Sequence, residues 1–175
     1  ELKTKPTQHS VRTLMENGIH ANVLVTRTER HLPKDVKAKL ALFCNVRKEN
    51  VIESLDADTI YEVPFLLHEQ NFDEVVLKGL DLPTDQEPDF TVWNKFLSNH
   101  KNPKNEIEIA LVGKYVSLHD SYKSITEAFT HAAATCETNV KVRWVYSGDI
   151  TEDNVGEQLK GVSGILIAPG FRSEE

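Results

Sequence analysis

Short apolar runs that alternate with amphipathic segments limit the fold of this 175-residue chain more than any other feature. The elements expected in its first half are a helix over 9–17, a strand over 22–26, a helix that begins at Leu32-Pro33, a strand over 51–55 and helical or turn structure over 60–67. In the second of these helices, Val36, Leu40 and Phe43 fall on one face. Strands and helices in this order predict a parallel sheet with helices packed on it.

A second series of the same kind begins at Glu106. Its expected elements are a strand over 107–112, a helix over 121–136, a strand over 140–146, a helix over 152–159 and a strand over 162–168. The helical residues expected to face the sheet are Ile125, Ala128, Phe129 and Ala132. This order predicts the first half of a doubly wound sheet whose first strand is central. Because such a half-sheet has a raw edge, we expect the chain to be a piece of a longer protein.

Two polar breaks separate the two series. Residues 82–89 are polar and interrupted by prolines, and residues 99–105 form a second break. The amphipathic helix expected between them, and expected to bridge the two cores, carries Phe90, Trp93, Phe96 and Leu97. The predicted organisation is a first domain over 1–82, a linker over 83–105 and a second domain over 106–175.

Charge is distributed unevenly along the chain. Residues 1–48 hold ten Lys and Arg against four Asp and Glu, whereas residues 49–175 hold ten against 23. A local excess of cations favours an anionic partner. Because few aromatic residues accompany these cations, a phosphorylated small molecule fits better than nucleic acid, which we do not expect as a partner.

Simpler observations exclude other classes of protein. No run of about 18 apolar residues could span a membrane, and we expect no membrane partner. Cys44 and Cys136 are too few for a disulfide framework or a metal knuckle. The histidines, His31 and His119 among them, lack metal-ligand spacing, so we interpret them as ordinary surface or loop residues and expect no metal ligand. A reducing, cytoplasmic setting is expected.

The segment 3–10 carries the clearest chemical pattern. Lys3 and Lys5 lie two residues apart, so in an extended chain they project on one face, and Pro6 fixes the backbone after them. The hydroxyl and amide side chains that follow add the donors and acceptors that carbonyl and phosphate groups require. A solvated loop in which Ser10 caps the next helix explains the same residues, and composition leaves both interpretations open.

Four blocks of sequence, in order, resemble the CTP synthases. They are ELKTKPTQHSV at 1–11, AKLALFCNV at 38–46, DADTIYEVP at 56–64, and IALVGKY with DSYKS at 109–115 and 120–124. The resemblance covers essentially residues 1–171. It implies an α/β fold that comprises the end of a Rossmann-like or P-loop-type synthetase domain, a linker helix and the first half of a flavodoxin-like class I glutaminase domain.

The resemblance also implies roles for particular residues. The site for UTP as substrate and CTP as feedback inhibitor, at a subunit interface, is formed by Lys3, Thr4, Lys5, Pro6, Thr7, Gln8 and, from the neighbouring helix, Lys39. Several lysines suit a triphosphate because each supplies an adaptable point charge. ATP adenine contacts Leu55, Asp56 and Ala57 through backbone groups. An alternative for Asp56 is an N-cap of the element that begins near Thr59.

In the second domain, the segment 168–171 matches the oxyanion loop of class I glutamine amidotransferases, and Gly170 matches the glycine that binds glutamine. From the residues alone, a plain turn glycine is the simpler interpretation. Residues 172–175 depart from the family pattern and receive no role. Neither cysteine is expected to be the glutaminase nucleophile. We therefore expect no catalytic residue in this chain, with the nucleophile and the ATP phosphate loop outside it.

The implied activity is the ATP-dependent amination of UTP to CTP, with ammonia from L-glutamine or free in solution, at the last step of de novo pyrimidine nucleotide synthesis. The resemblance further implies Mg²⁺ bound with ATP by ligands outside this chain, GTP as activator, and a cytoplasmic homotetramer. The chain alone is expected to be inert. Two alternatives stay open: a non-catalytic nucleotide-sensing relative, and another synthetase–glutaminase fusion.

Overall fold

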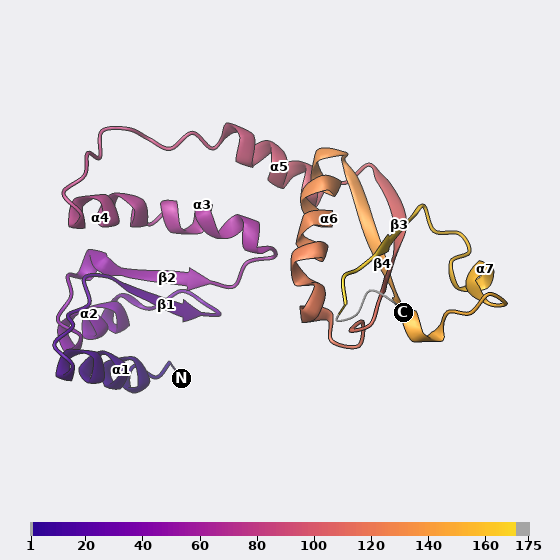
Figure 1. Cartoon of the computed structure of the whole chain (residues 1–175). Helices are drawn as coiled ribbons and strands as arrows, with labels where there is room; N and C mark the ends of the chain where they lie inside the picture. The colour runs from indigo at the N-terminus through magenta and orange to yellow at the C-terminus, as the bar shows by residue number, and fades with distance from the viewer. Residues whose placement is uncertain (1, 171–175) are drawn as a thin grey trace. The chain divides into compact units, whose positions relative to one another are not determined.

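The structure, a computed structural model, describes residues 2–170 and forms two compact units, residues 1–88 and 89–175 (Figure 1). Each unit holds a small parallel sheet covered by helices, as the alternation in the sequence predicts. The predicted linker over 83–105 falls across this division, and its helix lies in the second unit. The bridging role expected for that helix stays a prediction. No helix within residues 2–170 is long and apolar enough to cross a membrane.

The first unit is built on two parallel strands, β1 (Leu24–Thr28) and β2 (Val51–Leu55). Figure 1 shows two helices on either side of them: α1 (Lys5–Glu16) and α2 (Lys34–Phe43) on one side, and α3 (Val63–His68) and α4 (Phe72–Gly79) on the other. The short 3-10 helices η1 (Lys48–Asn50) and η2 (Ile60–Glu62) precede β2 and α3. The strand predicted over 51–55 is confirmed, whereas β1 begins two residues later than predicted and α4 was not predicted.

The core of the first unit lies between the strands and the first two helices. Its buried residues are Val11, Leu24, Leu40, Ala41, Cys44 and Val51. Cys44 is a small buried hydrophobe, and burial raises the pKa of its thiol. The prediction that Phe43 shares the buried face is wrong, because Phe43 is 60% exposed. The buried stripe of α2 instead advances by four residues, from Val36 through Leu40 to Cys44.

Helix α1 begins at Lys5, four residues before its predicted start. Pro6 lies in the first turn, where its missing N–H costs no helical hydrogen bond. The Gln8 N–H donates to the Thr4 carbonyl at 3.1 Å and closes that turn. Ser10 therefore lies inside α1, where its hydroxyl donates to the Pro6 carbonyl, and the Ser10 cap is wrong. The predicted stop is confirmed, since α1 ends before Asn17 and Gly18 has φ of +78°.

The second unit is built on three parallel strands in the order β4–β3–β5. They are β3 (Asn105–Gly113), β4 (Thr138–Tyr146) and β5 (Gly164–Ile167). The first of the three in the chain is central, which confirms that prediction. Its helices are α5 (Thr91–Lys101), α6 (Lys123–Thr135) and α7 (Val155–Gln158), with 3-10 helices η3 (His119–Tyr122) and η4 (Ser147–Asp149). Helix α5 packs beside α6, with the ring centroids of Phe96 and His131 5.9 Å apart.

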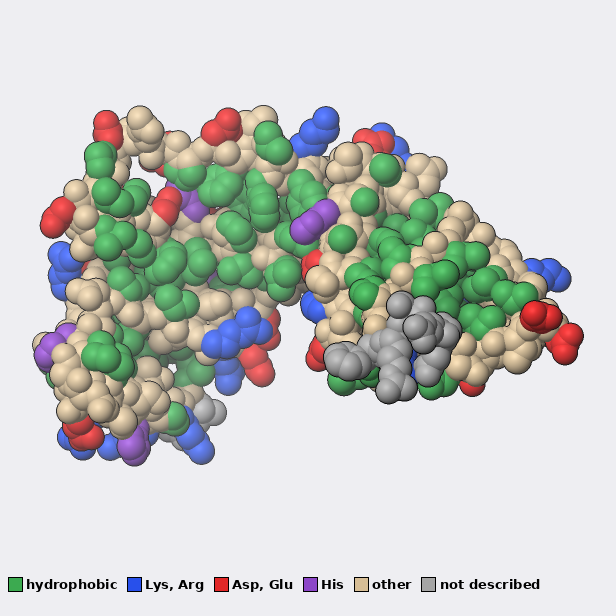
Figure 2. Space-filling model, in the orientation of Figure 1, with side chains coloured by type: hydrophobic (Ala, Val, Ile, Leu, Met, Phe, Trp, Pro, Cys, Tyr) green, Lys and Arg blue, Asp and Glu red, His purple; other side chains and the backbone are tan. Residues whose placement is uncertain are grey.

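Helix α6 covers one face of the β3 sheet. Ile125 and Phe129 pack on the buried Leu111, as predicted. Ala128 and Ala132 are exposed, so their predicted burial is wrong; the buried stripe advances by four residues from Phe129 to Ala133. Hydrophobic side chains also gather on the surfaces of both units (Figure 2). In the second unit they include Ile165 and Ile167 of β5, which are 54% and 80% exposed.

A glycine at the end of β3 fixes the chain that follows it. A Cβ at Gly113 would lie 2.6 Å from the Tyr122 hydroxyl and 2.9 Å from the tyrosine ring. The Tyr122 hydroxyl accepts a hydrogen bond from the Tyr115 N–H at 3.2 Å, and Tyr122 is 3% exposed. Glycine is therefore required for the tyrosine to close against the strand end.

Gly113→Ala is expected to lower the free energy of unfolding of the second unit by about 1–3 kcal/mol, because the new methyl overlaps Tyr122. Gly156→Ala is the matched control, since nothing beyond its chain neighbours and the backbone of its own helix would lie within 4 Å of that methyl. Its stability is expected to be unchanged or up to about 1 kcal/mol higher. Urea unfolding followed by tryptophan fluorescence measures both, because Trp93 and Trp144 lie in the second unit. Equal stability of the two variants would contradict the overlap.

Candidate functional site

The candidate nucleotide segment lies at the N-terminal end of α1. Thr4 is buried and has helical backbone angles, so the extended geometry predicted for Lys3 and Lys5 is wrong. Both lysines are exposed, and they stand where the free N–H groups of a helix favour an anion. The Gln8 side-chain amide donates to the Thr4 hydroxyl at 3.0 Å. This hydrogen bond ties the helix back to the segment before it.

A pocket of about 380 Å³ opens on this helix. It is lined by Lys5, Gln8, His9, Arg12 and Phe43. The first four of these residues follow helical i, i+3, i+4, i+7 spacing, which places them on one face of α1. His9 and Arg12 were not predicted as binding residues, because the helix was expected to begin at residue 9 and its face with Lys5 and Gln8 was not recognised. The pocket thus gathers two predicted nucleotide ligands with two further groups that can carry positive charge.

Lys39 is exposed on α2, one helical turn before Phe43 and therefore on the same stripe of that helix. Lys39 does not line the pocket on α1, which we call the α1 pocket, although Phe43 does. Lys3, Thr4 and Thr7 line a smaller cavity of about 90 Å³ with residues of β1 and α2. Pro6 is exposed in the first turn of α1. The predicted UTP residues are thus divided between neighbouring surfaces.

A second pocket, of about 400 Å³, lies at the carboxyl edge of the β1–β2 pair, and we call it the edge pocket. Its lining residues are Leu2, Arg27, Thr28, Glu29, Arg30 and Asp56. Parallel strands end at the same edge, which is where open α/β sheets bind ligands. Figure 2 shows basic side chains (blue) beside acidic ones (red) at the end of the first unit toward which the β1 and β2 arrows point. The edge pocket shares Leu2, Arg27 and Thr28 with the small cavity, so the two adjoin.

Asp56 lines the edge pocket, as its predicted contact with ATP requires, while Leu55 and Ala57 are half-buried and do not line it. The Arg27 guanidinium lies 2.6 Å from the Asp56 carboxylate. Both side chains are largely exposed, so this ion pair contributes little stability and a ligand can displace it. The N-cap alternative for Asp56 is wrong, because the Thr59 hydroxyl accepts the hydrogen bond from Tyr61 that begins η2.

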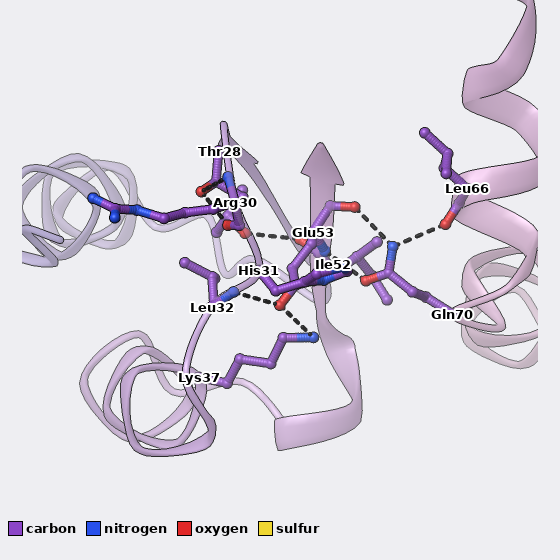
Figure 3. A network of polar contacts seen from close by, with 10 residues as sticks. Thr28, Arg30, His31, Leu32, Lys37, Ile52, Glu53, Leu66 and Gln70 are labelled. Carbon is purple, nitrogen blue, oxygen red and sulfur yellow. Dashed lines mark hydrogen bonds and ion pairs between the residues drawn. The ribbon is translucent and has the colours of Figure 1, made fainter. Parts of the chain in front are cut away.

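Glu53, in the middle of β2, carries a buried carboxylate that no sequence pattern indicated (Figure 3). Its Oε1 accepts hydrogen bonds from the Leu32 N–H at 2.9 Å and from Lys37 Nζ at 3.1 Å. Its Oε2 lies 2.8 Å from Nδ1 of His31, which is an exposed loop residue, as predicted, and which also contacts this carboxylate. Burial raises the pKa of Glu53, but these three groups outweigh it and hold the pKa below its ordinary value.

The side chain of Gln70, from the turn between α3 and α4, binds the backbone of Glu53. Its Oε1 accepts from the Glu53 N–H at 2.8 Å, and its Nε2 donates to the Glu53 carbonyl at 2.8 Å and to the Leu66 carbonyl at 2.9 Å. The amide therefore mimics a neighbouring strand along β2. Glu53 is anchored through its backbone as well as through its carboxylate.

In the second unit, Gly170 is exposed at the carboxyl edge of the sheet. The Ala168 N–H donates to the Val112 carbonyl at 2.8 Å, which extends the β5 pairing toward it. A Cβ at Gly170 would lie 3.7 Å from the Cβ of Lys114, an ordinary contact. The role of Gly170 in binding glutamine stays a prediction, and the rest of the predicted oxyanion loop, from residue 171, lies outside the described residues. Within residues 2–170, no group of three or more His, Cys, Asp and Glu could hold a metal ion.

The sequence of the chain is similar to a known family model and to several curated proteins. Residues 1–82 match the family model described as the CTP synthase N-terminus. The CTP synthases of Flavobacterium psychrophilum, Flavobacterium johnsoniae and Christiangramia forsetii are 61%, 58% and 54% identical to the chain over 171 residues. Each alignment covers 98% of this chain but 32%, 32% and 31% of the relative. The chain therefore spans about a third of the length of the curated relatives it matches.

Glu53→Gln is expected to reduce the free energy of unfolding of the first unit by about 1.5–3 kcal/mol at pH 7, the range for hydrogen bonds to a charged group. Because the pKa of Glu53 is lowered by folding, its contribution is complete above about pH 4.5 and is lost as the pH falls through its folded-state value. The difference between the variant and the wild type should therefore shrink toward acid pH. Urea unfolding followed by far-ultraviolet circular dichroism between pH 3 and pH 7 measures it. A difference independent of pH would contradict the ionised state of Glu53.

Proposed function

We infer from these relatives that the chain belongs to the CTP synthase family, and we propose that it is part of an enzyme that aminates UTP to CTP. The full reaction uses ATP to phosphorylate the uracil 4-oxygen. Ammonia, released from L-glutamine or supplied free, then adds at C4 and expels the phosphate. The first unit would supply nucleotide-binding groups, and the second would begin the glutaminase domain.

The observation that carries this proposal is the pair of cation-bearing surfaces in the first unit. Lys5, Gln8 and Arg12 line the α1 pocket, and Arg27 and Arg30 line the edge pocket. A donor and an acceptor of a phosphoryl group must both lie close to the transferred atom, and each carries a triphosphate here. Two cation-bearing pockets in one small unit, one of which adjoins the cavity lined by Lys3 and Thr28, fit that requirement.

The division of roles follows the predicted residues. UTP, and CTP as its competitor, would bind the N-terminal end of α1 through Lys3, Lys5 and Gln8, with Lys39 from α2. ATP would bind the edge pocket beside Asp56, where displacement of the Arg27 ion pair frees a guanidinium for the nucleotide. GTP activation and a homotetramer remain implications of the resemblance.

Mg²⁺ is expected to accompany ATP, but the described residues do not form a ligand set for it. The roles proposed for this chain do not depend on it. Gly170, at the carboxyl edge of the second sheet, is proposed to bind glutamine through its backbone. The nucleophile and the ATP phosphate loop are proposed to belong to other parts of the full-length protein.

In the full-length protein, Lys3→Ala and Lys5→Ala are each expected to raise KM for UTP by about 10- to 100-fold, because a hydrogen bond to a charged group contributes about 1.5–3 kcal/mol. Inhibition by CTP should weaken in parallel, since substrate and product share the triphosphate. Steady-state assays of CTP formation measure both, and glutamine hydrolysis should persist.

Lys48→Ala is the matched control, because Lys48 is an exposed lysine of η1 away from the α1 pocket. It should leave both constants unchanged. Unaltered UTP kinetics and CTP inhibition in the Lys3 and Lys5 variants would refute the assignment of this segment.

A further inference from the structure

Glu53 is a charged side chain that the proposed chemistry leaves without a role. It lies in β2 opposite Thr26, directly after the buried Val51 and Ile52. Its side chain is 6% exposed, and it does not line the edge pocket. Burial of a carboxylate is unfavourable unless the charge is paired and hydrogen-bonded. An apolar residue would suit this point of the strand better if packing were the sole requirement.

The three partners of the carboxylate all come from one stretch of chain. His31 and Leu32 belong to the loop between β1 and α2, and Lys37 belongs to the first turn of α2 (Figure 3). The Leu32 contact uses a backbone N–H, so it fixes the path of the main chain. Glu53 therefore holds the far end of the β1–α2 loop against β2.

The near end of this loop is held by a different side chain. The Thr28 hydroxyl donates to the Arg30 carbonyl at 2.7 Å and accepts from the Arg30 N–H at 3.4 Å. Thr28 is 9% exposed at the end of β1. Between these two tethers lie Glu29 and Arg30, which both line the edge pocket. The wall of the pocket is thus a short loop tied at both ends.

The Gln70 amide allows the tether to be tested without loss of the fold. It binds the Glu53 backbone on its own, through both the N–H and the carbonyl. β2 therefore keeps its anchors to β1 and to Gln70 when the carboxylate is neutralised. Loss of the negative charge is expected to release the loop rather than the strand.

We propose that Glu53 is a positioning residue of the edge pocket: its carboxylate holds the β1–α2 loop so that Glu29 and Arg30 keep the shape of the pocket that receives ATP. This inference rests on the proposed function for the identity of the ligand. The tether itself rests on the hydrogen bonds of Glu53 alone. Glu53 would act through the loop and touch neither nucleotide.

The test compares substrates in the full-length protein carrying Glu53→Gln. KM for ATP is expected to rise about tenfold, because small misplacements of binding groups have large effects, whereas KM for UTP should stay within about twofold. Hydrogen exchange at the Arg30 and Leu32 amides should become faster. Glu49→Gln is the matched control, since its side chain is 62% exposed and pairs with Arg47 outside the loop. It should alter none of these quantities.

His31→Ala is a milder second variant, because the His31 side chain is 81% exposed and its loss leaves two partners on Glu53. It is expected to raise KM for ATP about two- to threefold, without effect on KM for UTP. Equal changes in both constants, or none, in the folded Glu53→Gln protein would overturn the proposal. If that protein fails to fold, an unchanged KM for ATP in His31→Ala would overturn it instead.

The proposed function and the loop tether can be refuted separately. A wild-type protein that forms no CTP from UTP and ATP would refute the proposed function. Unchanged exchange at Arg30 and Leu32 in Glu53→Gln would refute the tether, whatever the activity. Arg27→Ala, which removes a lining residue of the edge pocket, should raise KM for ATP even if Glu53 has no such effect. A selective effect of Arg27→Ala without one of Glu53→Gln would overturn this inference and leave the proposed function standing.

Discussion

Parallel pairing of strands is the constraint on which both units depend. In the first unit it brings the ends of β1 and β2 to one edge, so that Arg27 and Asp56 meet although 28 residues separate them in the sequence. In the second unit, the central β3 brings Lys114 beside Gly170 in the same way. Backbone hydrogen bonds alone determine this edge, and side chains then decide what it can bind.

Two sets of charged contacts, around Glu53 and between Arg27 and Asp56, lie near the carboxyl edge of β1 and β2. The buried Glu53 carboxylate is bound by the Lys37 ammonium, the His31 ring and one backbone N–H, and together these hold the loop that forms one wall of the edge pocket. The exposed ion pair between Arg27 and Asp56 behaves differently, because water screens it and little is lost when it opens. The buried contacts of Glu53 would keep the shape of the pocket. The exposed ion pair of Arg27 with Asp56 could open to admit a charged ligand.

The sequence predicted the features that depend on local periodicity. The strand over 51–55 and the central position of the first strand in the second unit are confirmed. Errors arose where the register of a helix had to be chosen. Phe43 was assigned to the core although it is exposed, and Ala132 was assigned in place of Ala133, because steps of three and four residues both suit a helix and tertiary packing decides between them.

Only some of the residues that line the candidate pockets were predicted, because the others come together through tertiary structure. The predicted ligands Lys5, Gln8 and Asp56 do line pockets, but Arg12, Arg27 and Arg30 were missed. Arg12 was missed because the helix was predicted to begin at residue 9. Pro6, which suits the first turn of a helix, could have indicated the earlier start. The arginines and Glu53 have no signal in the local pattern, because their proximity results from the pairing of β1 with β2.

The central claim is that the first unit takes part in two adjoining nucleotide sites, one for a pyrimidine triphosphate and one for ATP. Equilibrium binding of radiolabelled UTP to the full-length protein tests it most directly, with CTP and a non-hydrolysable ATP analogue as competitors. CTP is expected to displace UTP, whereas the ATP analogue should bind beside it and leave UTP bound. Displacement of UTP by the ATP analogue, or failure of CTP to compete, would contradict two separate sites.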